Sequence, residues 1–396
     1  TDYGSWRFDN ATDRLLVTDN STASASNVKF GNAGASIEVA AGKTLNFTGT
    51  ITDTTSGGIS YLTKAGAGTL TLAGANAYSG ATAINAGIVT LNGSIAAGSA
   101  VSVASGATLG GTGTVNGTLA FTANAIHAPG IPTGTQTIAG ALGYANGSRV
   151  RWTLPASSDQ TGASSRIAAG NVTVAAGAVV DIVLNAAGST VNFTDSFWTR
   201  SRTWNVMSCA NKTGDFTLGT VTGDAAGRPV SNYGTLSLQQ NATTVSLVFT
   251  PYTPTEFWRQ ANFGANWNNP AISGDTVDGD GDGLSNLLEY ALGTDPNLST
   301  ATSAPQVSTP TGKLRITFTR NTAASDVGLF VMAADDLSAI WAEIASSING
   351  AAFTSTAGAA VNESGTGNPR TVQATDIYLT NDPAHPRRFM RLEVRR

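Results

Sequence analysis

Short apolar runs alternate with Gly, Asn and Ser along the first 250 residues of the chain. The clearest example is residues 62–93, LTKAGAGTLTLAGANAYSGATAINAGIVTLNG, in which Leu70 and Leu72 lie on one face of an expected strand. Apolar residues at every second position, interrupted by glycine at nearly even intervals, are typical of short strands separated by turns. Because such a coil cannot bury its apolar face alone, residues 62–93 predict one coil of a stacked β-solenoid.

Residues 62–87 also resemble the autotransporter-associated β-strand repeat, a motif of secreted bacterial passenger proteins. The resemblance rests on the paired GxG, the TLTL run, Tyr78 in the YSG turn and the closing Ala-Gly pair. Weaker versions of the motif lie at residues 39–49, 103–119 and 174–184. The resemblance implies a right-handed parallel β-helix, which we expect over residues 1–250, and a location outside the cell or at its surface.

The character of the sequence changes after residue 250. Thr253 and Glu256 have the spacing of a capping box, with Pro254 at the first helical position. A short helix is therefore expected to begin here and to stop at Gly264. We expect residues 251–300 to form a helical linker between two β domains.

Residues 278–289, DGDGDGLSNLLE, have the spacing of an EF-hand calcium loop. Closely spaced carboxylates supply hard oxygen ligands, Gly283 permits the sharp turn, and a carboxylate at the twelfth position can bind bidentately. The predicted ligands are Asp278, Asp280, Asp282, the carbonyl of Leu284, Asn286 and Glu289. We predict that this loop binds Ca²⁺; the alternative is a solvated acidic turn that precedes a helix.

Residues 257–296 resemble a calcium-binding linker of secreted verrucomicrobial and planctomycete proteins, akin to dockerin and thrombospondin type 3 loops. The segment departs from a paired EF-hand because the entering helix ends well before Asp278 and no second loop follows. A single, offset loop favours a static clamp over a sensor that opens a groove.

Five apolar, alternating segments follow in residues 301–396, among them KLRITFTR, VGLFVMAA and TVQATDIYL. Their even spacing predicts a small β-sandwich of immunoglobulin-like type. The segments FVMAADDLSAIWAEI and HPRRFMRLEV resemble the closing domain of the same secreted verrucomicrobial proteins. The expected organisation is thus a β-helix (1–250), a calcium linker (251–300) and a β-sandwich (301–396).

Composition agrees with a chain of stacked short strands. The sequence has 45 Gly and 12% charged residues, with a formal net charge of -4. The absence of a basic tract argues against nucleic acid as a partner, and no apolar run approaches the ~20 residues that span a bilayer. Cys209 is the single cysteine, so no internal disulfide can form. Because the chain starts at Thr1 without Met, we expect an exported form from which the signal peptide has been removed.

Residues suited to catalysis are sparse in the expected β-helix. Between residues 21 and 170 the acids are Glu38, Asp53 and Asp159, which are far apart in sequence. Sugar hydrolysis or elimination needs grouped carboxylates or a carboxylate with a base. His127 and His385 lie near prolines and are expected to be ordinary loop residues. We therefore predict that the protein is not an enzyme.

These patterns favour an extracellular structural or adhesive protein without catalytic activity. A solenoid with open ends can join head to tail, so we expect self-association, which would build a surface filament. The alternative expected partner is a component of the cell surface. A glycan-binding or polysaccharide-degrading β-helix is the alternative. Glycan binding would need exposed aromatic platforms, for which the candidates are Trp6, Tyr78, Trp198 and Trp204.

Overall fold

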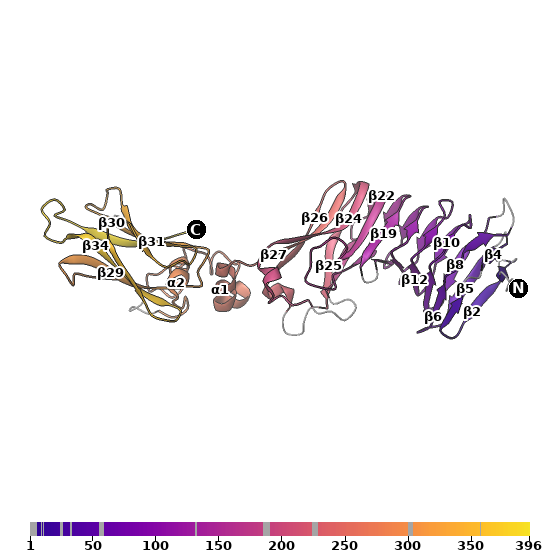
Figure 1. Cartoon of the computed structure of the whole chain (residues 1–396), viewed down its shortest axis with the longest axis horizontal. Helices are drawn as coiled ribbons and strands as arrows, with labels where there is room; N and C mark the ends of the chain where they lie inside the picture. The colour runs from indigo at the N-terminus through magenta and orange to yellow at the C-terminus, as the bar shows by residue number, and fades with distance from the viewer. Residues whose placement is uncertain are drawn as a thin grey trace. The chain divides into compact units, whose positions relative to one another are not determined.

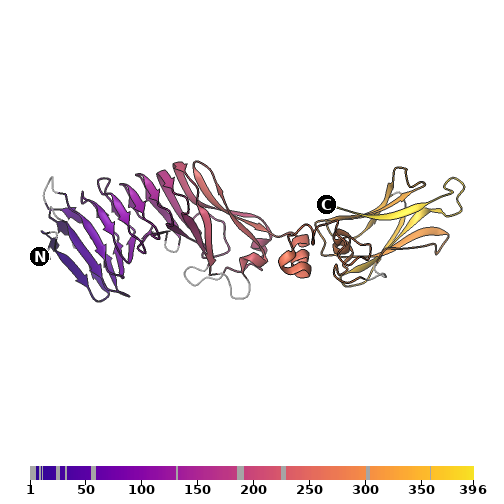
Figure 2. The same ribbon diagram turned by 180° about the vertical axis from the view of Figure 1, so that it is seen from behind.

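The chain folds into two compact units, Thr1–Pro251 and Tyr252–Arg396. The computed structural model describes residues 6–8, 10, 12–23, 27–31, 34–54, 59–130, 133–184, 191–223, 229–299, 304–356 and 358–396. The first unit consists of strands stacked coil upon coil (Figure 1), and the view from behind in Figure 2 shows the same stack.

The first unit is a parallel β-helix, as the sequence predicts. One sheet runs along it in the order β3 (Ser21–Ala23), β6 (Thr44–Phe47), β9 (Thr69–Leu72), β12 (Ile88–Leu91), β15 (Thr108–Gly111), β18 (Ile126–Pro129), β21 (Arg149–Thr153), β23 (Val179–Val183) and β25 (Thr217–Thr222). A second row is β2 (Arg14–Val17), β5 (Ala35–Val39), β8 (Leu62–Ala65), β11 (Thr82–Ile84), β14 (Val101–Val103), β17 (Leu119–Phe121) and β20 (Leu142–Tyr144). The remaining rows are β1 (Trp6–Phe8), β4 (Val28–Phe30) and β7 (Ile51–Asp53), and then β10 (Ala75–Asn76), β13 (Ser94–Ile95), β16 (Thr114–Val115) and β19 (Gly134–Ile138).

Equivalent apolar residues of successive coils are stacked on one another. Leu70 of β9 is the register partner of Val89 of β12, which in turn pairs with Leu109 of β15. All three side chains are buried. The alternation that predicts single strands in the sequence therefore becomes one continuous core when the coils stack.

The recurrent glycines reflect how closely the coils approach. Gly66 adopts a φ of 73°, and a Cβ at this position would lie 2.2 Å from the carbonyl oxygen of Val39 in the preceding coil. A side chain is therefore excluded both by backbone conformation and by contact with the neighbouring coil. The same exclusion holds at Gly87, where a Cβ would lie 2.4 Å from the carbonyl oxygen of Gly68, whereas Gly42 and Gly106 have a positive φ without such a contact.

The β-helix ends in an antiparallel sheet. β22 (Ser165–Val174) pairs with both β19 and β20, and β24 (Arg202–Thr213) continues it in parallel. β27 (Thr244–Pro251) then pairs antiparallel with β24 and with β26 (Gly234–Gln240). Two 3₁₀ turns, Ser196–Thr199 and Val230–Asn232, lie between these strands. Buried aromatic rings fill this end, where the Trp198 ring centroid lies 5.7 Å from that of Trp204 and 5.0 Å from that of Phe249.

The second unit contains two four-stranded antiparallel sheets, in agreement with the predicted β-sandwich. One sheet has the order β28 (Gln306–Ser308), β29 (Lys313–Arg320), β34 (Arg370–Leu379) and β33 (Ala360–Ser364). The other has the order β32 (Thr354–Ser355), β31 (Ala342–Ile348), β30 (Gly328–Ala334) and β35 (Phe389–Arg395). Among the described residues, no helix is both long enough and apolar enough to cross a membrane.

Two helices precede the sandwich in the second unit. α1 (Pro254–Phe263) begins with the predicted capping box: the Glu256 backbone N–H donates to Thr253 Oγ1 and the Thr253 N–H donates to Glu256 Oε2. The 3₁₀ turn Gly264–Asn266 follows α1, and α2 is Asn286–Leu292. Leu292 is buried in the core of the sandwich, and its carbonyl accepts a hydrogen bond from Thr319 Oγ1 at 2.9 Å. The helical segment thus shares one core with the two sheets.

Candidate metal centre

The predicted calcium loop lies between Val277 and α2 in the second unit. Its two ends are joined by backbone hydrogen bonds, from the N–H of Asn286 to the carbonyl of Val277 (2.8 Å) and from the N–H of Leu287 to the carbonyl of Asp275 (3.1 Å). Asp275 accepts hydrogen bonds from the guanidinium groups of Arg259 and Arg396. The loop is therefore anchored at its base while its tip remains free to face a ligand.

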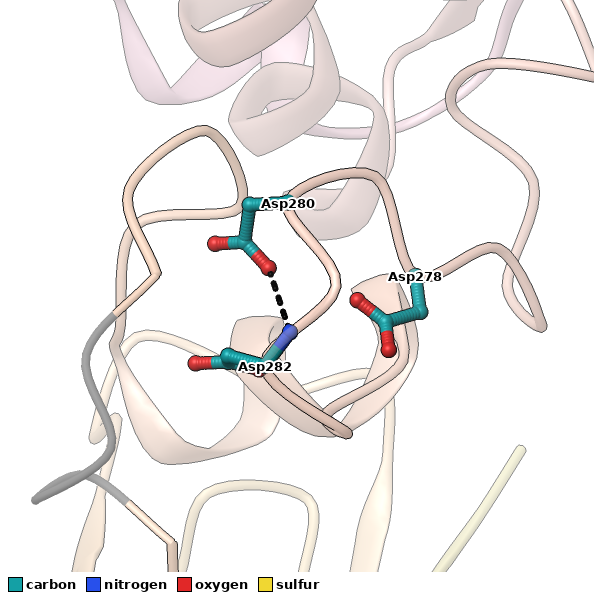
Figure 3. Close-up of side chains that lie close together, drawn as sticks. All are labelled: Asp278, Asp280 and Asp282. Atoms are coloured by element: carbon teal, nitrogen blue, oxygen red, sulfur yellow. Dashed lines mark hydrogen bonds between the residues drawn. The ribbon is translucent and has the colours of Figure 1, made fainter.

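Three aspartates of this loop lie together (Figure 3). One carboxylate oxygen from each of Asp278, Asp280 and Asp282 lies within 4.8 Å of the other two. The loop backbone orients these side chains: Asp278 accepts from the N–H groups of Gly281 and Gly283, and Asp280 Oδ1 accepts from the N–H of Asp282 at 3.3 Å. The alternating positions one, three and five of the predicted pattern therefore do converge.

Gly283 allows the chain to turn back toward α2. Its φ of 92° lies in the left-handed region that other residues rarely adopt. The turn leaves the N–H of Leu284 donating to Asp282 Oδ1 at 2.9 Å. Glycine at this position is thus required by backbone conformation, as the calcium-loop pattern predicts.

Glu289 of α2, the twelfth position of the pattern, is not part of the group whose carboxylate oxygens lie within 4.8 Å of one another, although the charges of the three aspartates act on it. Its side chain is fully buried, with Oε1 accepting a hydrogen bond from Thr294 Oγ1 at 3.2 Å, whereas Oε2 has no partner. Burial, together with repulsion from Asp280 and Asp282, raises the pKa of Glu289 to about 7. A buried carboxylate of this kind gains strongly from a cation placed against its open oxygen.

Asp280 contributes a second open oxygen. Its Oδ2 is buried and has no hydrogen-bond partner, although Oδ1 is bound to the loop backbone. Among the described residues, none of the ion pairs includes Asp278, Asp280 or Glu289. The charges of Asp278, Asp280 and Glu289 are therefore not neutralised by a basic side chain among the described residues.

The other two predicted ligands, Leu284 and Asn286, each have a structural contact in addition to any role in metal binding. The Leu284 side chain is buried in the sandwich core, so only its backbone carbonyl is available for a ligand role. Asn286 uses its amide Nδ2 to donate to the carbonyls of Ile272 (3.0 Å) and Gly274 (2.9 Å), while its buried Oδ1 has no partner. Asn286 thus ties the segment before the loop to α2, and its part in metal binding stays a prediction.

Thr294 is a residue of this site that the sequence analysis did not identify. It follows α2 and holds Glu289 twice, through Oγ1 to the carboxylate and through its backbone N–H to the Glu289 carbonyl at 3.1 Å. The twelve-residue loop pattern ends at Glu289, so it carries no information on a supporting residue five positions later. Only the close of the helix at Gly293 brings Thr294 back beside the carboxylate.

The arrangement suits a hard divalent cation. Three converging carboxylates of the loop offer oxygen ligands, with Glu289 of α2 as a further predicted one, and Ca²⁺ prefers six to eight oxygen ligands. The predicted set contains no imidazole or thiolate, the ligands typical of structural zinc sites. The open oxygens of Asp280 and Glu289 are the two observations that fit a bound cation best.

The expectation that His127 is an ordinary loop residue is wrong. It lies in β18 and is fully buried, with Nδ1 2.6 Å from Tyr144 Oη and Nε2 2.8 Å from Gln136 Oε1. Because Gln136 Nε2 donates to the carbonyl of Gly110, its Oε1 must accept, so His127 carries its proton on Nε2. The histidine therefore fills a core position, where Gln136 of its own coil and Tyr144 of the next coil satisfy it.

The expected aromatic platforms for a glycan are also wrong where the structure describes them. Tyr78 is fully buried and its hydroxyl lies 2.6 Å from Thr82 Oγ1. Trp198 and Trp204 are buried at the closed end of the β-helix. The side chain of Trp6 lies outside the described residues. Packing of the core accounts for the three described rings.

The three acids between residues 21 and 170 each bind a separate partner. Glu38 forms an ion pair with Arg14 at 2.9 Å, and Asp159 forms one with Arg202 at 2.9 Å. Asp53 accepts from the backbone N–H of Ser79 at 3.1 Å. Each of these acids therefore makes the kind of contact that stabilises a fold.

Comparison with known families identifies the central coils of the β-helix. Residues 62–91 match the model of the passenger-associated-transport-repeat. They run from β8 through β12, which is the stretch that the sequence pattern singles out. No curated protein matches the chain. The repeat indicates a passenger-like extracellular β-helix protein of the autotransporter kind, exported or held at the cell surface.

Proposed function

We propose that this chain is a non-catalytic extracellular structural or adhesive protein whose C-terminal unit is stabilised by one calcium ion. The observation that carries the calcium part is the buried carboxylate of Glu289, which has one oxygen without a partner beside a cluster of three aspartates. Asp278, Asp280, Asp282 and Glu289 would supply carboxylate oxygens to the ion, and Leu284 a carbonyl oxygen. Calcium would neutralise charge that no basic residue of the loop balances.

The effect of the ion would extend into the sandwich, because the loop and the core share residues. Leu284 lies within the loop and in the core, and α2 carries Glu289 on one turn and buried Leu292 on the next. Since anything that binds only the folded form stabilises it by mass action, calcium should stabilise the whole C-terminal unit. The tight packing of α2 supports a static clamp more than a moving sensor.

The structural role of the first unit is supported by its architecture. Stacked coils bury one continuous core, and the acids Glu38, Asp53 and Asp159 have separate structural partners. Within the described residues, β2 and β3 each end a sheet and have a neighbour on one side only. An open strand edge of this kind can pair with another strand, which supports head-to-tail self-association as part of the proposal.

Isothermal titration of the chelator-treated full chain with Ca²⁺ tests the metal site. We expect about one site, lost or strongly weakened in Asp280→Asn and in Glu289→Gln, since each removes a ligand charge. Asp295→Asn is the matched control, because Asp295 is an exposed acid just outside the loop. Absence of calcium binding by the intact chain, or equal binding by Glu289→Gln, would refute the calcium site.

Electron microscopy of the full chain over a range of concentrations tests self-association. Filaments with a regular axial repeat would support a surface filament. Single particles at every concentration, with a constant mass in analytical ultracentrifugation, would leave adhesion as the role and remove the filament.

A further inference from the structure

A polar cleft opens on the β-helix beside the loop that joins β21 to β22. The loop, residues 154–164, is held by three side chains from the closed end of the helix. The Trp198 indole N–H donates to Ser157 Oγ (3.0 Å), the Trp204 indole N–H donates to the carbonyl of Ser158 (2.8 Å), and Arg202 pairs with Asp159. The wall of the cleft is therefore fixed in place before any ligand arrives.

The cleft has a volume of about 220 Å³ and a lining rich in hydroxyl and amide groups. This volume would hold roughly seven water molecules at ~30 Å³ each, which is room for one sugar ring and little more. The polar side chains that line it are Asp159, Gln160, Thr161, Ser164, Arg166, Thr203 and Asn205, and the carboxylate of Asp159 is paired with Arg202. The hydroxyl and amide groups of this lining can both donate and accept hydrogen bonds, which suits a ligand with several hydroxyls.

Arg166 gives this cleft a charge that is not balanced. Its Nε is buried and has no hydrogen-bond partner, and no ion pair among the described residues includes it. Arg149 and Arg202 differ from Arg166 in having an ion pair: Arg149 pairs with Asp181, and Arg202 pairs with Asp159. A guanidinium without an ion pair gains strongly from a carboxylate, which its two terminal Nη groups can bind through two parallel hydrogen bonds while the buried Nε stays out of reach.

We propose that this cleft binds a uronate unit of an acidic polysaccharide. The carboxylate of the sugar pairs with Arg166, and its ring hydroxyls exchange hydrogen bonds with side chains such as Gln160, Thr203 and Asn205. A peptide carboxylate would satisfy Arg166 equally, but a peptide offers one backbone N–H and one C=O per residue, whereas a sugar ring carries several hydroxyls that each donate and accept within the volume of this cleft. The lining therefore favours a carboxylated sugar over an acidic peptide.

This inference goes beyond the proposed structural role and does not depend on the calcium loop, which lies in the other unit. It gives the β-helix a surface for acidic glycans that relies on charge and hydrogen bonds and not on aromatic stacking. Binding would be of one charged sugar unit at a time, so contact with a long polysaccharide gains strength through many copies of the protein.

Saturation-transfer NMR and isothermal titration of the calcium-loaded full chain with oligogalacturonate and oligoglucuronate test the inference. Arg166→Gln should weaken binding about tenfold or more, since a charge-assisted hydrogen bond is lost. Asn205→Asp should also weaken binding, because it places a negative charge in the cleft while keeping the acceptor that Ser208 uses. Arg151→Gln is the control, because Arg151 is exposed on β21 and does not line the cleft.

Three results would overturn the inference. They are absence of saturable binding to either uronate oligomer, equal binding of a neutral oligosaccharide of the same length, and equal binding by Arg166→Gln with an unchanged melting temperature. Preferential binding of an acidic peptide of matched charge would likewise assign the cleft to another ligand. Failure of calcium titration alone would leave this site untouched, so the two proposals are tested separately.

Discussion

In the β-helix, the buried ammonium of Lys64 is held by three backbone carbonyls, whereas in the C-terminal unit the buried carboxylate of Glu289 keeps one oxygen without a partner. The Lys64 Nζ donates to the carbonyls of Ala65 (2.7 Å), Gly66 (2.7 Å) and Ala86 (3.1 Å). Both side chains are fully removed from solvent. One charge is satisfied by the chain itself and the other is not.

The difference follows from how each unit is built. In a solenoid, the turns of successive coils lie one above the other, so carbonyls from two coils can surround one ammonium group. At the predicted calcium loop, the charged groups that act on Glu289 are the carboxylates of Asp278, Asp280 and Asp282, and like charges cannot satisfy one another. The contrast supports the proposal that a cation stabilises the C-terminal unit, whereas Lys64 in the β-helix is satisfied by the chain's own carbonyls.

Removal of calcium should have the largest effect, because it should lower the melting temperature of the C-terminal unit and leave that of the β-helix unchanged. If the free calcium concentration is about a thousand times the dissociation constant, the bound ion stabilises the folded unit by ~4 kcal/mol. This corresponds to a rise in melting temperature of roughly 10 °C. Differential scanning calorimetry with and without chelator should therefore show one transition that moves and one that does not. Movement of both transitions, or of neither, would contradict the comparison.

Lys64→Met should destabilise the β-helix by about 3 kcal/mol, because the carbonyls that bind the ammonium lose a charged donor while the side-chain volume is kept. Lys43→Met is the matched control. The Lys43 ammonium lies at the surface, 3.2 Å from exposed Asp19, and its loss should cost about 0.5 kcal/mol or less. Urea unfolding of both variants measures the difference; equal costs would show that the internal lysine has no special role.

His127 should make the β-helix sensitive to acid. Burial lowers the pKa of His127 to about 4 from an ordinary value of 6.5, so between these values the unfolded chain binds more protons than the folded one. Stability is then complete above pH 6.5 and falls as the pH drops toward 4, by about 2 to 3 kcal/mol for this group.

The matched variant is His127→Phe, which keeps a ring between Phe121 and Tyr144 but cannot titrate. It should lower stability at pH 7, since Tyr144 and Gln136 lose a partner. Its further loss between pH 7 and pH 4 should be smaller than that of the natural chain in denaturant unfolding. An equal loss would assign the acid sensitivity to other groups.

Thr253→Ala should have the smallest effect. It removes the hydroxyl that accepts from the Glu256 N–H at the start of α1, which typically costs about 1 kcal/mol. Only the C-terminal transition should shift, by a few degrees, and Thr253→Ser should restore it. A shift of the β-helix transition in calorimetry would contradict the independence of the two units.

Much of the architecture could be predicted from local pattern. Leu70 and Leu72 alternate with threonines, and the glycines recur with the coils, because stacking imposes the same requirement on every coil. The capping box of Thr253 and Glu256 was likewise predictable, since both partners lie within one turn. The buried position of His127 was not predictable, because its partner Tyr144 belongs to the next coil and only the stacking brings the two together.

The candidate metal site likewise has features that the sequence predicts and features that it does not. The spacing of Asp278, Asp280 and Asp282 predicts three converging carboxylates, because a twelve-residue loop determines their relative positions. The support of Glu289 by Thr294 was hidden, since it depends on how the chain turns after α2. The unbalanced charge of Arg166 was hidden as well, because whether an arginine has a partner is decided by residues distant in sequence.

The sequence alone determined the periodic features of this protein: the strands of the β-helix, the helix start at Thr253 and the aspartate spacing of the loop. These depend on neighbours within a few residues or on a repeat. The tertiary structure decided which buried polar groups are satisfied, as it did for Lys64 and His127, and which are left open, as for Glu289 and Arg166. The physical reason is that hydrogen bonds and charges are matched in space, between segments whose separation along the chain carries no record of the contact.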